Sequence, residues 1–253
     1  MRIVVLLLVF CSVARAQIVN VQGAIAKPPD KNEVDGQVEL KLSWAEGNAP
    51  AFDAAGAASV VWKHDRFLSL AQVRGEYGTA LHVENTKKTF EHLRERVTLS
   101  CLWRWEAFAQ HEYDQFRRLS LRMLVGTGPA LQILNEKEYA LITGLSYMFE
   151  VEELDTREGV SDSGISYTEH RGNLYLTGRE KLVENVAFVQ TIYVQPRLDD
   201  FSNYRLLGDA ALEVKLSKRF AITDGFLVDY DSRPPQQVRS WDTTLKVGLV
   251  ITL

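Results

Sequence analysis

The sequence predicts an all-β fold, a single antiparallel up-and-down transmembrane β-barrel of about twelve strands over residues 36–253. Three observations support this prediction. Apolar and polar residues alternate over segments longer than the about 5–6 residues of an ordinary strand, and about 9–11 residues cross a bilayer at a tilt. Twelve is an even number, as in single-chain bacterial barrels. Short turns alternate with mostly longer loops, which is the asymmetry expected between the two sides of an outer membrane.

The first residues have the pattern of a signal peptide over 1–16. Arg2 precedes an apolar run at 3–11, and Ala14-Arg15-Ala16 provides a cleavage site of small residues. The chain is therefore expected to leave the cytoplasm by the general secretory route. Residues 17–35 are polar and contain Pro28-Pro29, so we expect them to form a periplasmic lead before the barrel.

Turn-forming and polar segments then divide the chain into strands. In the first half the breaks include residues 47–50, the His64-Asp65 pair, a polar loop expected at 79–87 and a tight connection near Cys101. Later breaks lie at 135–137, 151–165, 196–203, 217–218 and 231–240, of which 151–165 is the longest and is acidic. The predicted strands are about 36–46, 52–63, 66–78, 88–100, 103–113, 117–133, 138–150, 166–177, 183–195, 204–216, 219–230 and 241–253.

The alternation is clearest in the central hairpin, residues 103–133. Successive side chains of a strand point to opposite faces, so Trp103 and Trp105 share the outward face while Arg104 and Glu106 share the inward one. In the second strand of this hairpin the outward residues are Leu119, Leu121, Met123, Val125 and Thr127, and the inward residues are Arg118, Ser120, Arg122, Leu124, Gly126 and Gly128.

Aromatic residues lie near the predicted strand ends, as expected for rings at two membrane interfaces. One belt contains Trp44, Tyr77, Phe90, Tyr113, Tyr147, Phe149, Tyr204, Tyr230 and Trp241, and the other contains Trp62, Phe67, Trp103, Trp105, Tyr139 and Phe220. The last strand keeps its apolar alternation up to Leu253, which stands in place of the usual terminal aromatic. We expect the barrel-assembly machinery to read this strand.

Four stretches resemble one known family: EYDQFRRLSLRMLVGTGPAL at 112–131, GQVELKLSWAEGNAP at 36–50, YVQPRLDDFSNYRL at 193–206 and YDSRPP at 230–235. They are similar, in order and spacing, to the YdiY-like family of salt-induced outer membrane proteins, a domain of unknown function. The resemblance covers about residues 36–253. It implies an outer-membrane β-barrel in a Gram-negative envelope, and it carries no established activity to particular residues.

The sequence does not predict an enzyme. Lipid-hydrolysing barrels place a serine two positions after a histidine, whereas here the five corresponding residues are Arg66, Glu84, Arg94, Tyr113 and Gly172. A catalytic pair assembled from separate strands stays open. The mature chain has one cysteine, Cys101, and no zinc-type spacing. The acidic segment 150–162 either binds divalent cations or is a solvated loop without an EF-hand pattern. We expect no cofactor, no metal site and no nucleic-acid partner.

The inward face of the central hairpin is the candidate site. Charges of both signs in a narrow lumen should pair because isolated charges are costly there, and fixed charges set ion selectivity in confined pores. The predicted lumen charge cluster is Arg104, Glu106, Arg118 and Arg122. It either plugs the barrel or lines a small pore.

The function expected is an outer-membrane barrel that acts as a small pore or as an envelope-stabilising protein. Its expected partners are membrane lipids, lipopolysaccharide, the assembly machinery, and small ions or solutes. An outer-membrane lipid-modifying enzyme and a soluble periplasmic protein that binds an apolar ligand are the alternatives.

Overall fold

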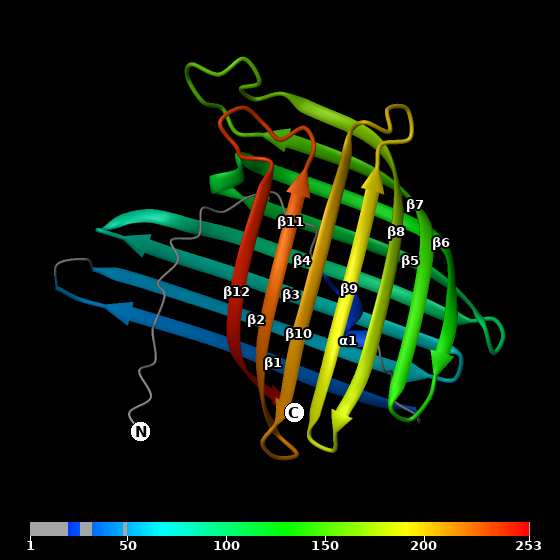
Figure 1. The fold of residues 1–253 in the computed structure, drawn as a ribbon. Helices are drawn as coiled ribbons and strands as arrows, with labels where there is room; N and C mark the ends of the chain where they lie inside the picture. The colour runs from blue at the N-terminus through cyan, green and yellow to red at the C-terminus, as the bar shows by residue number, and fades with distance from the viewer. Residues whose placement is uncertain (1–19, 26–31, 48–49, 253) are drawn as a thin grey trace.

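The computed structural model describes residues 20–25, 32–47 and 50–252 (Figure 1). The predicted signal peptide and the terminal Leu253 lie outside these residues. Within them the chain forms twelve strands, as predicted, and two single-turn helices. The elements are α1 (Gln22–Ile25), β1 (Glu33–Ala45), β2 (Ala51–His64), β3 (Phe67–Ala80), β4 (Val83–Thr98), β5 (Trp103–Asp114), η1 (Gln115–Arg117), β6 (Leu119–Asn135), β7 (Tyr139–Leu154), β8 (Ser166–Val183), β9 (Val186–Pro196), β10 (Tyr204–Lys215), β11 (Phe220–Asp231) and β12 (Trp241–Thr252).

Each strand pairs antiparallel with its neighbours in sequence, and β1 pairs with β12 to close the barrel. The predicted fold class is therefore confirmed. The pairing between β1 and β12 is short. It runs only from Gln37 opposite Thr252 to Leu40 opposite Leu249, whereas β1 pairs with β2 over its whole length. We call this contact the seam.

The connections differ between the two ends of the barrel. At one end, the turn end, the strands are joined by residues 65–66, 99–102, 136–138, 184–185 and 216–219. At the other, the loop end, the connections include 155–165, 197–203 and 232–240. This asymmetry is the one predicted. No helix in the described part of the chain is long and apolar enough to cross a membrane.

The prediction of a polar loop at 79–87 is wrong, because β3 continues to Ala80 and β4 begins at Val83. The hairpin is turned by Leu81 and His82 alone, both at positive φ (51° and 64°). Two-residue hairpins need this conformation, but it is normally supplied by Asn or Gly, so the sequence gave no sign of it. Phe90, expected in an aromatic belt, is instead buried in the lumen, because it shares the inward face of β4 with Arg94 and Arg96.

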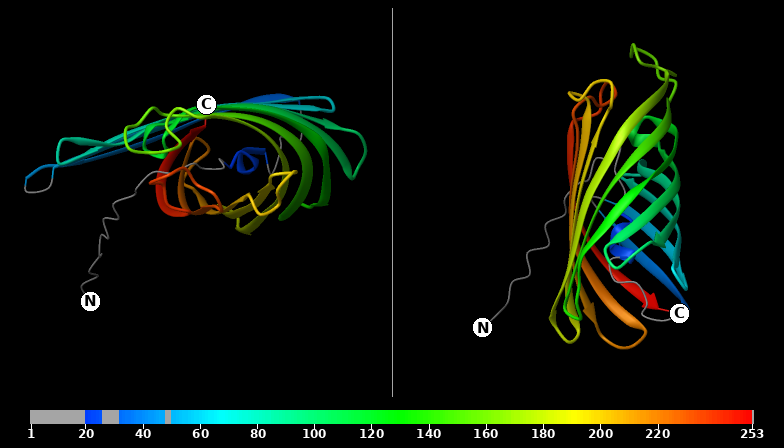
Figure 2. Two further views of the ribbon diagram at one scale, coloured as in Figure 1. Left: turned by 90° about the horizontal axis from the view of Figure 1, so that it is seen from above. Right: turned by 90° about the vertical axis from the view of Figure 1, so that its right-hand side faces the viewer.

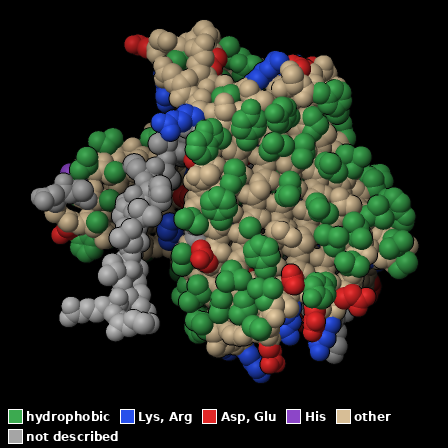
Figure 3. Space-filling model, viewed as in Figure 1, with side chains coloured by type: hydrophobic (Ala, Val, Ile, Leu, Met, Phe, Trp, Pro, Cys, Tyr) green, Lys and Arg blue, Asp and Glu red, His purple; other side chains and the backbone are tan. Residues whose placement is uncertain are grey.

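The wall separates an apolar outside from a polar inside. On β5 Trp103 and Trp105 are about half exposed, while Glu106 and Phe108 on the opposite face are buried. One broad face of the barrel is covered mainly by hydrophobic side chains, with charged ones gathered towards its rims (Figure 3). Such a surface is stable when it faces lipid rather than water.

The predicted faces of β6 need one correction. The pairing with β7 shifts between Leu119 and Leu121, and a bulge of this kind displaces the alternation locally. Leu119 is consequently buried and Ser120 exposed, the reverse of the prediction. From Arg122 onward the predicted faces hold.

The N-terminal helix α1 is not part of the wall. Seen along the barrel, it lies inside the ring of strands (Figure 2). Residues 20–25 belong to the segment expected as a periplasmic lead, and residues 33–35 of that segment already belong to β1. The lumen therefore contains a segment of the N-terminal backbone as well as the side chains of the wall.

Candidate functional site in the lumen

The lumen holds two layers of charged side chains. The first, the turn-end layer, consists of Arg94, Arg96, Glu106 and Tyr175. The Glu106 carboxylate accepts hydrogen bonds from Arg94 Nη1 (2.8 Å), Arg96 Nε (2.6 Å) and the Tyr175 hydroxyl (2.9 Å). All four side chains are buried. Because a buried carboxylate is stable only when it is paired and hydrogen-bonded, these strands are held in a fixed relation around Glu106.

The second, the loop-end layer, is larger and centres on Glu150 of β7, which is fully buried. Glu150 pairs with Arg122 of β6 (2.7 Å) and Arg205 of β10 (2.7 Å), and Arg171 of β8 lies 3.6 Å away. Charge-assisted contacts of this kind are the strong ones. The layer consists of Arg117, Arg122, Arg171, Arg205, Glu112, Glu150, Glu152, Glu169, Asp229 and Asp231.

Some of these contacts cross the lumen. Arg117, between β5 and β6, reaches Asp229 of β11 at 3.3 Å, and β6 and β11 are five strands apart in the order of the barrel. Arg205 binds Glu152 (2.8 Å) and Asp231 (3.0 Å) in addition to Glu150. The layer therefore ties opposite walls together.

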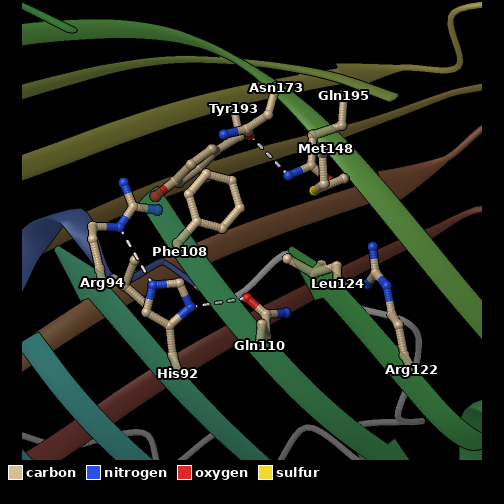
Figure 4. A pocket seen from close by; sticks show the side chains of 11 residues that line it. His92, Arg94, Phe108, Gln110, Arg122, Leu124, Met148, Asn173, Tyr193 and Gln195 are labelled. Atoms are coloured by element: carbon tan, nitrogen blue, oxygen red, sulfur yellow. Dashed lines mark hydrogen bonds between the residues drawn. The ribbon is translucent and has the colours of Figure 1, made fainter. Parts of the chain in front are cut away.

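Between the two layers lies a chamber (Figure 4), called the neutral chamber because most of its lining side chains are uncharged. Gln195 Nε2 donates to Asn173 Oδ1 (2.9 Å), and Arg94 Nε donates to His92 Nε2 (3.3 Å). The empty space has a volume of about 20 Å³, room for about one or two water molecules. The chamber is lined by Val21, His92, Arg94, Phe108, Gln110, Arg122, Leu124, Met148, Asn173, Tyr193 and Gln195. At this volume the chamber itself admits nothing larger than water.

A model of the family described as "Protein of unknown function, DUF481" matches residues 38–253. The chain belongs to the DUF481 family. A search of curated proteins finds no match.

Several solved structures are similar to this chain. An outer membrane channel from Pseudomonas putida F1 has a TM-score of 0.51 at 11% identity, over 89% of this chain and 98% of the channel. The translocator domain of the autotransporter NalP from Neisseria meningitidis has a TM-score of 0.49 at 10% identity, over 92% and 90%. The NanC porin has a TM-score of 0.46 at 8% identity, over 87% and 98%. The likeness to the channel shows that this DUF481 chain has the fold of outer-membrane barrels.

The structure does not bring the four predicted site residues together. Glu106 and Arg122 are both buried in the lumen, but in different layers. Arg104 lies at the turn end, where its Nη1 donates to the carbonyl oxygens of Ser100 (2.6 Å) and Trp103 (3.1 Å). The physical reason is the antiparallel register, in which Arg104 lies opposite Ala130 and the partner of Arg122 is Glu112.

Arg118 lies at the loop end of this DUF481 barrel. It adopts a left-handed conformation (φ 61°) after η1 and is fully buried. Its guanidinium binds Asp155 (2.9 Å) and Asp162 of the loop 155–165, and the Gln236 backbone N–H of the loop 232–240 donates to Asp162 (2.7 Å). Arg118 thus fastens two loops at the loop end.

These hydrogen bonds determine the ionisation of Asp162. Burial raises the pKa of Asp162, but the hydrogen bonds from Arg118 and from the Gln236 backbone outweigh burial and hold the pKa below its ordinary value. Among the described residues, no group of three or more His, Cys, Asp and Glu side chains could hold a metal ion. Of the acidic residues at 150–162, Glu150 and Glu152 belong to the loop-end layer, and Asp155 and Asp162 bind Arg118.

Sequence reasoning missed most of the loop-end layer. Glu152 was excluded because the predicted strand stopped at 150, although the inward alternation of β7 continues to Leu154. Arg171 begins the regularly alternating part of β8, and Arg205 is the second residue of β10. Extending the alternation of β7 beyond residue 150 would have found Glu152, and applying it within the predicted strand 204–216 would have found Arg205.

Two glycines also shape the site. A Cβ at Gly126 would overlap the ring of Phe108, and one at Gly144 would overlap the ring of Tyr175. The absence of a side chain therefore lets both rings lie flat against the wall, where Tyr175 reaches Glu106.

Proposed function

We propose that this chain is a non-catalytic β-barrel of the outer membrane that provides a narrow pathway for small ions and is closed at rest. The observation that carries the proposal is the loop-end layer, in which Arg117–Asp229 and Arg205–Glu150 contacts join separate parts of the wall across the lumen. The same charges that close the lumen would line a hydrophilic path once they separate, because paired charges regain water when the pair opens.

The placement in the outer membrane is supported by the wall. Its strands are long enough to cross a bilayer, and its outward residues, such as Leu145 (58% exposed), are apolar. We further propose that the chain is a YdiY-like, salt-induced member of its family, exported by the general secretory route. Its partners would then be outer-membrane lipids, lipopolysaccharide and, through β12, the barrel-assembly machinery.

The test is conductance in planar lipid bilayers, with Glu150→Gln as the main variant. Removing this carboxylate charge leaves Arg122, Arg171 and Arg205 without their common partner. We expect them to repel one another and open the lumen, so that Glu150→Gln shows more frequent conductance steps than the wild type. Its reversal potential in a salt gradient should shift towards anions, because the lining gains net positive charge.

The matched control is Glu153→Gln, three residues along the same strand but exposed on the outward face. It should behave as the wild type. A heat-modifiability gel, on which folded and boiled barrels migrate differently, shows whether each variant is folded. If Glu150→Gln is folded but shows no conductance, the proposal of a pore is overturned.

That silent outcome would favour a second function, an envelope-stabilising barrel without transport. The observation in its favour is that the buried charges at the centre of each layer are paired with opposite charges, as expected if the network serves only to join the walls. A pore and an envelope-stabilising barrel therefore predict opposite results for the conductance of Glu150→Gln.

A further inference from the structure

The N-terminal residues 20–25 lie in the lumen although they take no part in the sheet. Val21, Gln22 and Ile25 are each at most 2% exposed, and α1 packs against β2 and β9. We propose that this segment is a removable plug that closes the turn-end half of the lumen. The inference rests on the proposed pore and adds the device that regulates it.

The first argument is the match between apolar surfaces. Val21 and Ile25 form one buried cluster with wall residues from three adjacent strands, Val61, Leu68, Leu70 and Phe90. Without residues 20–25 this apolar patch would be exposed to water in the lumen. Residues 20–25 cover it, and the hydrophobic effect favours that arrangement.

The second argument is a shared arginine. Arg96 donates through Nε to Glu106 (2.6 Å), through Nη2 to Gln22 Oε1 (2.7 Å) and through Nη1 to the Ile25 carbonyl oxygen (3.3 Å). The turn-end layer and the segment therefore use the same guanidinium. Opening of this layer would release the segment, and departure of the segment would leave two donors of Arg96 without these partners.

The third argument is position. Val21 lines the neutral chamber together with His92, Tyr193 and Gln195, so the segment forms part of the chamber boundary. Its anchors are few, whereas each wall strand is held by long ladders on at least one side. Among the described contents of the lumen, residues 20–25 are thus the part that can leave without breaking the sheet.

The test uses the full chain carrying Val21→Asp together with Ile25→Asp. Two carboxylates do not fit the apolar patch, so the segment should leave the lumen while the chain length is unchanged. In planar bilayers we expect the open time to rise about tenfold or more over the wild type, because the closed state loses its differential contacts. Val34→Asp is the control, since Val34 is 64% exposed on β1.

A synthetic peptide with the sequence of residues 20–25, Asn-Val-Gln-Gly-Ala-Ile, supplies the complementary test. Added in excess on the turn-end side of the double variant, it should shorten the open time. The same peptide with Asp in place of Val and Ile should have no effect. Block by the native peptide alone supports the plug.

The outcomes separate the two proposals. If the double variant is folded and gates like the wild type while Glu150→Gln conducts, the plug is overturned and the pore stands. If neither conducts, the pore itself fails. Should the double variant not fold, Gln22→Ala replaces it, because it removes the Arg96 acceptor without adding charge. An unchanged open time in folded Gln22→Ala, with no block by the native peptide, would overturn the plug.

Discussion

Two parts of the wall differ in what packs against their lumen side. In β5–β8, the packed wall, inward residues such as Ile142 and Met148 are buried and outward residues such as Leu145 are exposed. In β1 and the adjoining β2, the open wall, the loop-end half is exposed on both faces of β1, from Lys41 to Ala45. β1 has the same period-two alternation in its sequence as the packed wall. The difference shows that the lumen contents, and not the ladder, bury the inward face of the packed wall.

The lumen contents also explain where the open wall begins. The loop-end layer draws its members from β5 to β8, β10 and β11, and α1 covers the turn-end part of β2 to β4. Nothing described reaches Lys41 or Ser43 of β1. Their polar side chains are consistent with water on that side of the wall.

The largest expected effect comes from removing a charge behind the packed wall. Arg205→Met would leave Glu150, Glu152 and Asp231 short of a partner, and breaking a buried ion network in this way costs about 3–5 kcal/mol. Lys41→Met, on the inward face of the open wall, should cost under about 1 kcal/mol. Denaturant titration in lipid vesicles, followed by tryptophan fluorescence, measures both free energies of unfolding. Equal costs would remove the distinction between the two walls.

A smaller effect tests whether both walls face lipid. Val125→Arg on β6 and Leu245→Arg on β12 are outward, near mid-strand and more than half exposed. Arginine near the bilayer midplane costs about 2–4 kcal/mol, falling to about 0–1 near an interface. We expect similar costs for the two variants in the same titration. A cost near zero for Leu245→Arg alone would mean that the strand beside the seam does not face hydrocarbon.

The smallest effect compares two glycines. Gly144→Ala would push a methyl group into the Tyr175 ring, and overpacking of this kind costs about 1–3 kcal/mol. A Cβ at Gly56 would meet only Leu40 Cδ2 at 3.7 Å, so Gly56→Ala should be neutral or stabilising by about 0.4–1 kcal/mol. Thermal or denaturant unfolding of the two variants gives the ranking. Gly56→Ala being the more damaging would contradict the assigned packing.

The sequence was sufficient to predict the wall because the faces of a strand are set by residues that are neighbours in the sequence. The alternation of Trp103, Trp105 and Glu106 reports a lipid face and a lumen face from neighbouring positions alone. Two local features were still missed, the Leu81-His82 turn, which lacks Asn or Gly, and the bulge at Leu119–Leu121. The residue types at these two places do not indicate the backbone conformation that the chain adopts there.

The lumen contacts could not be predicted in the same way because they are not local. Whether Arg117 meets Asp229 depends on barrel closure and on the stagger of strands around the ring, which no single strand encodes. Glu106 and Arg122 were correctly assigned to the inward face, but which layer each joins follows from that stagger. The apolar residues Val21 and Ile25 show no periodic pattern, so their return into the lumen had no sequence signature.

The seam has a consequence for how the barrel forms. It joins the first strand to the last, so Gln37 must find Thr252 across almost the whole chain. Contacts between such distant residues are slow to form, and four residue pairs offer little to hold an early encounter. We therefore expect the seam to be the last part of the sheet to form. Until then β1 and β12 present free edges, which pair readily with other chains, so the unfinished sheet is the species most prone to aggregate.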